Sequence, residues 1–198
     1  MNARLFRVSF TGELGFEINV PASGAVRVWD ALLSRVESLG GTPYGTEAMH
    51  VLRAEKGYII VGQDTDGSIT PFDLGMGGMV SKSKDFLGRR SLTRSDTARS
   101  DRKQLVGLLT DDTSLVLPEG SQLTERSQAS PPPVPMLGHV TSSYFSPALK
   151  RSIAMALVRD GHARSGQKIH AALADGRYVA ATVGSTVFYD PEGKRLHA

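Results

Sequence analysis

Two short alternating segments meet in the stretch Ser9-Phe10-Thr11-Gly12-Glu13-Leu14-Gly15-Phe16-Glu17-Ile18-Asn19-Val20. Apolar residues occupy every second position on both sides of the glycine-containing break, at 6, 8 and 10 and again at 16, 18 and 20. This period of two predicts a strand over 6–11 and another over 16–20. Because successive side chains of a strand project to opposite faces, we expect Glu17 and Asn19 to share one face of the second strand.

Glu17 has two interpretations at this point. Glutamate is mostly exposed in proteins, so a solvated strand residue is the simpler one. A carboxylate held on a rigid strand beside a glycine-lined gap can also accept two parallel N–H bonds from a planar, amide-like ring. The alternation alone favours the solvated residue over the ligand-binding one.

Composition limits the class of protein. The chain has 198 residues, 40% of them hydrophobic, no cysteine and a formal net charge of +3. Disulfides, thiolate nucleophiles and cysteine-bound metals are therefore excluded, and the scattered basic residues are a poor footprint for nucleic acid. No apolar run approaches the roughly 20 residues of a membrane helix, and no signal-type core follows Met1. We expect a cytoplasmic protein that binds neither nucleic acid nor membrane.

The N-terminal half predicts helices and turns. Apolar residues at helical spacing predict a helix over residues 24–39, with Ser23 as the N-cap and Trp29 packed in a core. A second helix is expected over Thr46–Lys56, where Glu55 lies unfavourably near the C-terminal end and needs a partner such as Arg53 or remains on the surface. A short buried strand is expected over Tyr58–Val61.

Turns and short helices should follow that strand. Gly62–Gly67 is expected to be a turn that lacks the full set of calcium ligands. Thr70-Pro71 favours a helix start, and a further helix is expected from Phe86 to about Arg94 with Asp85 as its cap.

After a polar linker at 96–103 the pattern becomes strand-like. Several short strands with turn signals between them indicate a small antiparallel barrel or sandwich. An Asp175-Gly176 pair favours a hairpin between the last two strands. The expected strands are Gln104–Thr110, Gln122–Glu125, Leu137–Thr141, Ser152–Val158, Lys168–Leu173 and Arg177–Val187.

Motifs for common catalytic chemistry are missing from the sequence. The five histidines show no paired zinc spacing, and there is no phosphate-binding loop, Rossmann glycine pattern or serine elbow. Spacing alone therefore indicates a two-part binding protein of unknown ligand.

Several segments in order along the chain resemble the glycine-cleavage T-protein (aminomethyltransferase) family. They extend from about residue 5 to 190. The matching segments are Phe10–Ile18, Leu52–Tyr58, Gly62–Asp66, Thr70–Gly75, Lys84–Gly88, Gly138–Ser142 and Phe145–Pro147. Within that family, Pro43–Gly57 looks most like the C-terminal, T-protein-like part of heterotetrameric sarcosine oxidase α subunits.

The resemblance implies an α+β fold with three parts. Residues 1–95 would form a partial, N-terminally truncated aminomethyltransferase folate-binding domain, 96–103 a linker, and 104–198 a small antiparallel β-barrel domain. It also implies a tetrahydrofolate site, where the one-carbon unit of oxidised sarcosine is captured as 5,10-methylenetetrahydrofolate. Glu17 matches the family carboxylate that binds the ring N–H and amino group of the pterin, and Tyr58 matches an aromatic position at the folate site.

The chain departs from the family pattern in ways that matter for the site. Phe10 stands where T-proteins usually have tyrosine, and Met49 stands where many have arginine. The family's catalytic aspartate lies N-terminal to the pterin carboxylate, in a segment that the 16 residues before Glu17 do not supply. No catalytic residue is therefore assigned to this chain, and we expect the chain alone to be inactive.

The expected partners are folate and either the missing N-terminal lobe or other sarcosine oxidase subunits. An apolar surface near Phe6, Val8, Phe10 and Met76 should be exposed or covered by self-association. Three alternatives stay open: a glycine-cleavage-type aminomethyltransferase or dimethylglycine oxidase fragment, a folate-binding or assembly module without turnover, and a purely structural subunit.

Overall fold

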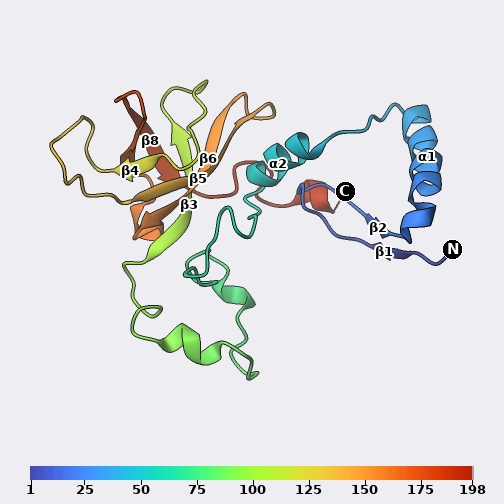
Figure 1. Ribbon diagram of the computed structural model, residues 1–198, viewed down its shortest axis with the longest axis horizontal. Helices are drawn as coiled ribbons and strands as arrows, with labels where there is room; N and C mark the ends of the chain where they lie inside the picture. Colours follow the sequence, from blue (N-terminus) through green and yellow to red (C-terminus); the bar gives the residue numbers. More distant parts are fainter. Residues whose placement is uncertain (198) are drawn as a thin grey trace. The chain divides into compact units, whose positions relative to one another are not determined.

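The computed structural model describes residues 1–197, which form two compact units. The first unit comprises Met1–Arg53 and the chain from Asp190 onward, and the second comprises Ala54–Tyr189 (Figure 1). In residues 1–197 no helix is long and apolar enough to cross a bilayer. The elements are β1 Arg4–Phe6, β2 Glu17–Asn19, α1 Ala22–Ser38, α2 Thr46–Glu55, η1 Gly77–Met79, η2 Arg89–Thr93, β3 Lys103–Thr110, β4 Gln122–Thr124, β5 Gly138–Ser146, β6 Arg151–Arg159, η3 Gly161–Arg164, β7 Lys168–Ala172, β8 Tyr178–Gly184 and η4 Lys194–Leu196.

The first unit contains the two predicted strands in a shorter form. β1 and β2 pair antiparallel, with Arg4 opposite Asn19 and Phe6 opposite Glu17. The prediction of a strand over 6–11 was wrong in position, because residues 7–16 form the connection between the strands. Within that connection the Ser9 hydroxyl accepts a hydrogen bond from the Gly12 amide at 3.0 Å, which bends the chain away from an extended course.

Helix α1 occupies the predicted segment, but its cap and its apolar face differ from the prediction. Pro21, not Ser23, is the N-cap residue, and the Gly24 amide bonds to the Pro21 carbonyl at 2.8 Å. Gly24 is the one buried residue of α1, and Trp29 is 57% exposed. The predicted core packing of Trp29 is wrong, because the described residues of this unit place no apolar layer over that face.

Exposed apolar side chains are common in this unit. Phe6, Val8 and Phe10 are all exposed, as predicted for this surface. Met76, which was grouped with them, is half-buried and belongs to the second unit.

Helix α2 ends where the sequence predicts, but no strand follows it. Gly57 has a φ of +73°, which a glycine adopts readily at the end of a helix. Residues 58–60 are irregular, and Val61 makes only an isolated bridge to Thr65. The prediction of a strand over Tyr58–Val61 was wrong. The Asp64 carboxylate accepts a hydrogen bond from the Ile60 amide at 2.9 Å, and this bond closes a turn instead.

The two helices predicted after the turn are also wrong in form. Thr70 and Asp73 bond reciprocally through side chains and amides, as in a helix cap, yet residues 71–75 form only a turn. In the Phe86–Arg94 segment the structure has the 3-10 helix η2, which begins after Gly88 rather than after Asp85.

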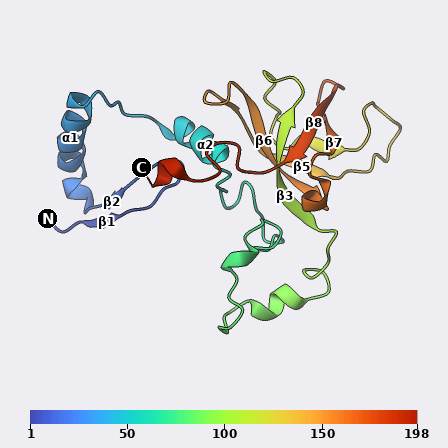
Figure 2. The ribbon, with the colours of Figure 1, turned by 180° about the vertical axis from the view of Figure 1, so that it is seen from behind.

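Strands β3 to β8 close into an antiparallel barrel in the order β3-β6-β5-β4-β7-β8 (Figures 1 and 2). The prediction of a small antiparallel barrel is therefore confirmed, and the Asp175-Gly176 pair lies in the β7–β8 hairpin as expected. β5 is longer than predicted, because it continues past Thr141 to Ser146.

Two apolar clusters lie on the two faces of the barrel wall. The inner cluster draws residues from all six strands, including Leu108 and Val158. The second cluster contains Leu105, Met155 and Leu157 from the other face of β3 and β6, with Ala54 and Ile59 packed against them. β6 is thus buried on both faces, which explains its unbroken apolar run Ile153–Val158.

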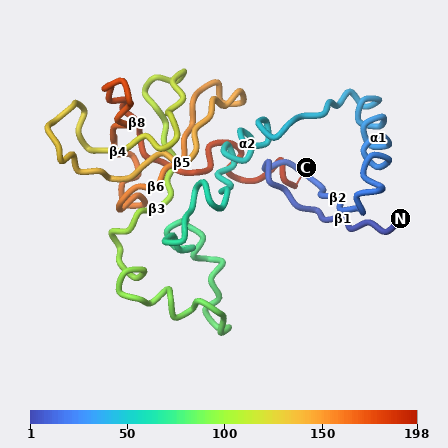
Figure 3. The backbone as a smooth tube through the Cα atoms, in the orientation of Figure 1, coloured from blue at the N-terminus to red at the C-terminus, as the bar shows by residue number. Residues whose placement is uncertain are grey.

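The long irregular excursion between Gly67 and Arg102 runs from the turn after α2 to the start of β3, and Figure 3 shows it as the teal-to-green loop. The Leu105 amide of β3 bonds to the Asp73 carbonyl at 2.8 Å, so one part of the excursion lies directly against the barrel.

Candidate functional site

The sequence-predicted carboxylate lies on the β1–β2 ribbon. Glu17 is exposed, and its Oε1 accepts a hydrogen bond from Nδ2 of Asn19 at 2.8 Å. This bond shows that the two side chains share a face of β2, as the alternation predicts. Phe10, in the connection between the strands, is 37% exposed.

Tyr58 lies in the second unit, immediately after Gly57, and is half-buried. The three predicted site residues are thus divided between the units, with Glu17 and Phe10 in the first and Tyr58 in the second. Their joint role in one binding site stays a prediction.

The segment that carries Tyr58 is anchored to the barrel at its start. Glu55 is only 3% exposed, and its Oε1 accepts a hydrogen bond from the Ser146 hydroxyl of β5 at 2.5 Å. Its carbonyl also accepts the amides of Phe188 and Tyr189, each at 2.9 Å. Glu55 is therefore a buried structural acceptor and not a surface residue.

The same segment is anchored again at its end. Asp64 is completely buried, and its Oδ1 accepts the hydroxyls of Thr141 and Ser142, each at 2.6 Å. Its Oδ2 accepts the Ile60 amide at 2.9 Å. A carboxylate with this many donors is well stabilised without solvent.

A cavity of about 780 Å³ in the second unit is lined by residues of the 67–102 excursion. Its lining is mostly apolar, and two cations, Lys84 and Arg94, lie among the lining residues. Prominent apolar members of the lining are Ile69, Leu74, Met76, Met79, Phe86 and Leu92.

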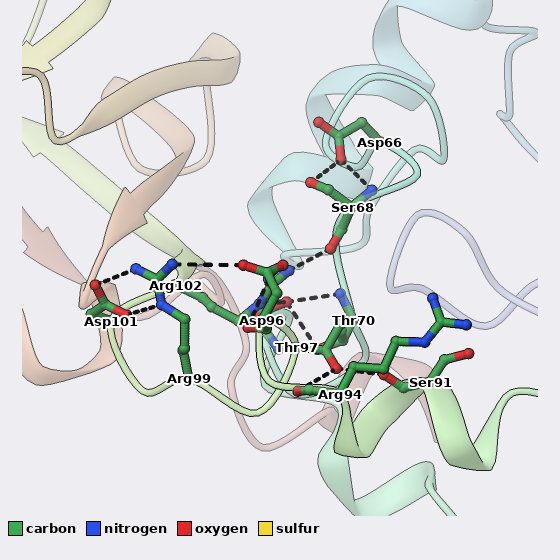
Figure 4. Close-up of polar contacts among 11 residues, drawn as sticks. Asp66, Ser68, Thr70, Ser91, Arg94, Asp96, Thr97, Arg99, Asp101 and Arg102 are labelled. Carbon is green, nitrogen blue, oxygen red and sulfur yellow. Dashed lines mark hydrogen bonds and ion pairs between the residues drawn. The ribbon is translucent and has the colours of Figure 1, made fainter.

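Arg102 joins the two ends of that excursion. Its guanidinium donates to the Asp73 carboxylate at 3.1 Å, to the Asp96 carboxylate at 2.8 Å and to the Ser68 carbonyl. Figure 4 shows Arg102 with Asp96 and Ser68, together with Thr70 and the Arg99–Asp101 ion pair. The Arg102 and Asp73 side chains are only 9% and 4% exposed, so this ion pair is shielded from water.

A smaller polar cleft of about 290 Å³ lies next to this network, and its lining includes Asp66, Lys103, His139 and Arg159. Hydrogen bonds from Ser68 lower the pKa of Asp66. Burial, and then the positive charge of Lys103, lower the pKa of His139, although Asp66 opposes them. His139 therefore favours its neutral form in the folded protein.

Within residues 1–197 no three histidine or acidic side chains gather closely enough to hold a metal ion. Asp64 and Asp66, which a calcium loop would have used, serve hydroxyl and amide donors instead.

Two families of domain match this chain in order: the GCVT N-terminal domain over residues 1–84 and the glycine cleavage T-protein C-terminal barrel domain over residues 103–190. The second match coincides with the closed barrel. The chain belongs to the glycine-cleavage T-protein family.

Relatives of this T-protein-family chain include sarcosine oxidase α subunits and aminomethyltransferases. It is 50% identical over 98% of its length to the sarcosine oxidase subunit alpha of Corynebacterium sp. (strain U-96), covering 20% of that protein. It is 33% identical over 96% of its length to the aminomethyltransferase of Thermotoga petrophila, covering 49% of it. The resemblance to the T-protein-like part of sarcosine oxidase α subunits is thereby confirmed.

A solved structure shares the fold. The crystal structure of glycine cleavage system aminomethyltransferase T from Bartonella henselae matches with a TM-score of 0.79 and 26% identity, over 94% of this chain and 50% of that one. The T-protein-family chain thus spans about half the length of an aminomethyltransferase and about a fifth of a sarcosine oxidase α subunit.

Two features of the site region did not follow from the sequence pattern. Arg102 lies in the predicted polar linker, for which no ion pair was expected. Asp64 lies in the predicted turn Gly62–Gly67, yet its bonds to β5 join segments far apart in the chain. The reciprocal Thr70–Asp73 spacing was a usable signal, because such a pair stabilises tight turns as well as helix starts.

Proposed function

We propose that this chain supplies the tetrahydrofolate-binding part of a sarcosine oxidase α subunit. In this role it supports the transfer of the one-carbon unit of oxidised sarcosine to tetrahydrofolate, giving 5,10-methylenetetrahydrofolate. The observation that carries the proposal is the 50% identity to a sarcosine oxidase subunit alpha along 98% of the chain. The family that matches residues 1–84, whose members bind folate, supports the choice of cofactor.

Glu17 is the residue we propose to hold the pterin. It lies on a paired strand, and its carboxylate is accessible to a ligand. Asn19 donates to one of its oxygens, which steadies the side chain in one orientation. An ionised carboxylate can accept the ring N–H and the amino group of a pterin side by side, and a glutamine cannot accept both. Phe10 and Tyr58 would add apolar and aromatic contact.

The test uses the complete native protein with any partner subunits. Calorimetric titration with tetrahydrofolate should show binding that weakens about 10- to 100-fold in Glu17→Gln, as expected for losing hydrogen bonds to a charged group. Glu37→Gln, the same change on the exposed surface of α1, is the matched control and should bind as the wild type does.

Product analysis tests the transfer itself. During sarcosine turnover, the Glu17→Gln variant should release more free formaldehyde and form less 5,10-methylenetetrahydrofolate, while sarcosine consumption stays unchanged. Faster turnover of dimethylglycine than of sarcosine would favour the dimethylglycine oxidase alternative. Wild-type protein that binds no tetrahydrofolate would contradict the proposal and favour a structural or assembly subunit.

The partners we propose are the remaining parts of such an enzyme. The exposed side chains of Phe6, Val8 and Phe10 form a surface that another chain or a second copy can cover. Light scattering of the isolated chain checks this, since a strictly monomeric protein would contradict self-association.

A further inference from the structure

Residues 55–64, which carry Tyr58, are tied to a single barrel strand at both ends by buried carboxylates. Glu55 accepts the hydroxyl of Ser146, and Asp64 accepts the hydroxyls of Thr141 and Ser142. All three donors belong to β5. The segment therefore spans the strand between two fixed points.

A bulge in β5 makes the second attachment possible. Val140 pairs with Ala156 and Ser142 pairs with Met155, so Thr141 is skipped in the β5–β6 register, although its hydroxyl lies within hydrogen-bond distance, 3.2 Å, of the Met155 carbonyl oxygen. In a regular strand, successive side chains such as these two would project to opposite faces. At the bulge both hydroxyls instead reach the same oxygen of Asp64 at 2.6 Å. The Thr141 carbonyl also accepts Nε2 of Gln63 at 3.3 Å.

The middle of the segment is also confined. A Cβ on Gly57 would lie 2.6 Å from the Thr186 carbonyl oxygen, so the chain passes very close to the strand β8 exit at this position. Ile59 packs against the cluster formed by the outer face of β3 and β6. Tyr58 is thus held between two neighbours that contact the barrel.

We propose that Asp64 and the Thr141–Ser142 bulge are positioning elements that hold Tyr58 in place for folate binding. This inference rests on the proposed function, in which Tyr58 contacts the cofactor. A side chain that is ordered before binding loses less conformational freedom when the ligand arrives. Asp64 matters more than Glu55 here, because it gathers two hydroxyls and the Ile60 amide at the end of the segment.

The first test does not depend on folate. Combining Thr141→Val with Ser142→Ala removes both hydroxyl donors and leaves the strand's bulk largely intact. Hydrogen exchange measured by mass spectrometry on the complete native protein should show faster exchange of the amides in 56–64. Ser152→Ala is the control: its buried hydroxyl lies on the neighbouring strand β6 and has no hydrogen-bond partner among the described residues. Unchanged exchange in the double variant would overturn the proposal.

The second test measures tetrahydrofolate binding at a temperature where every variant is folded. The Kd of the double variant should rise roughly tenfold, as expected if Tyr58 occupies its binding position about a tenth of the time. In a Tyr58→Ala background the same double change should no longer alter the Kd. A Kd shift that persists there would show a general structural effect and overturn the positioning role.

The two tests separate the two hypotheses. Wild-type protein without folate binding would refute the proposed function, and the exchange result would still decide whether the carboxylates hold the segment. Folate binding that is unaffected by the double variant, with faster exchange, would refute the positioning role alone.

Discussion

The barrel and the β1–β2 ribbon with α1 carry equally regular apolar patterns, but only the barrel buries them. Leu108 and Leu123 in the barrel are fully buried, whereas Leu5 and Trp29 are 64% and 57% exposed. The barrel strands close on themselves and enclose their inner face, while two paired strands and one helix cannot. The difference shows that periodicity determines local conformation, and that burial needs an opposing layer.

Leucine truncation should break this comparison most strongly. Leu108→Ala in β3 should lower the free energy of unfolding by about 2–5 kcal/mol, because the closed barrel cannot collapse around the cavity. Leu5→Ala in β1, a strand leucine that is 64% exposed, should change it by less than about 0.5 kcal/mol. Urea unfolding followed by circular dichroism gives both values, and equal losses would contradict the contrast.

Ion pairs should show the same contrast with a smaller effect. Arg102→Met leaves the buried Asp73 carboxylate without its cation and should cost about 3 kcal/mol, the lower end for breaking a buried pair. Arg195→Met breaks the exposed pair with Glu13 in the first unit and should cost about 0–1 kcal/mol. Denaturant unfolding of each variant gives its free energy of unfolding for comparison with the wild type. An Arg102 variant as stable as the Arg195 variant would refute the shielding of that pair.

Glycine substitution sharpens the comparison at the backbone. A Cβ on Gly138 in β5 would lie 1.8 Å from the Leu157 carbonyl oxygen, so Gly138→Ala should cost about 1–3 kcal/mol through displaced strands. A Cβ on Gly45, in the first unit, would meet no atom within 4 Å, so Gly45→Ala should be neutral or slightly stabilising. The melting temperatures of the two variants, measured by thermal unfolding, test this difference in stability.

The smallest expected effect is on the pH dependence of the free energy of unfolding. Burial lowers the pKa of His139 below its ordinary value of 6.5, so the unfolded chain binds this proton more readily than the folded one. Stability should therefore rise with pH between the folded pKa and 6.5, and fall on acidification through that range. His139→Gln should flatten this part of the pH profile of unfolding. An unchanged slope near pH 6 would contradict the assignment to His139.

The sequence predicted the barrel well and the excursion before it poorly. Alternation and the Asp175-Gly176 turn are local signals, and both survive in β3–β8. Residues 58–61 and 70–73 also look locally regular, but Asp64 and Asp73 draw their backbone amides into turns. Such competition depends on where the carboxylates end up, which periodicity does not specify.

The residues of the candidate site also divide into those whose geometry could be predicted from the sequence and those whose role could not. The shared face of Glu17 and Asn19 follows from the period of two, and their hydrogen bond confirms that geometry. The role of Asp64 could not be predicted, because its partners Thr141 and Ser142 lie in a distant strand and reach it only through a bulge. The folate role of Glu17, Phe10 and Tyr58 stays a prediction.

The bulge has a consequence for how this barrel could be shortened. Its unpaired residue sits between two stretches of β5 that already match β6 on either side, from Gly138 to Val140 and from Ser142 to Ser146. Deleting Thr141 would join these stretches into one continuous ladder without moving any other partner. The barrel would then remain closed after a one-residue deletion, while Asp64 would lose the Thr141 hydroxyl and keep that of Ser142. A homologue that lacks this residue would therefore keep the fold but hold residues 55–64 against β5 less firmly.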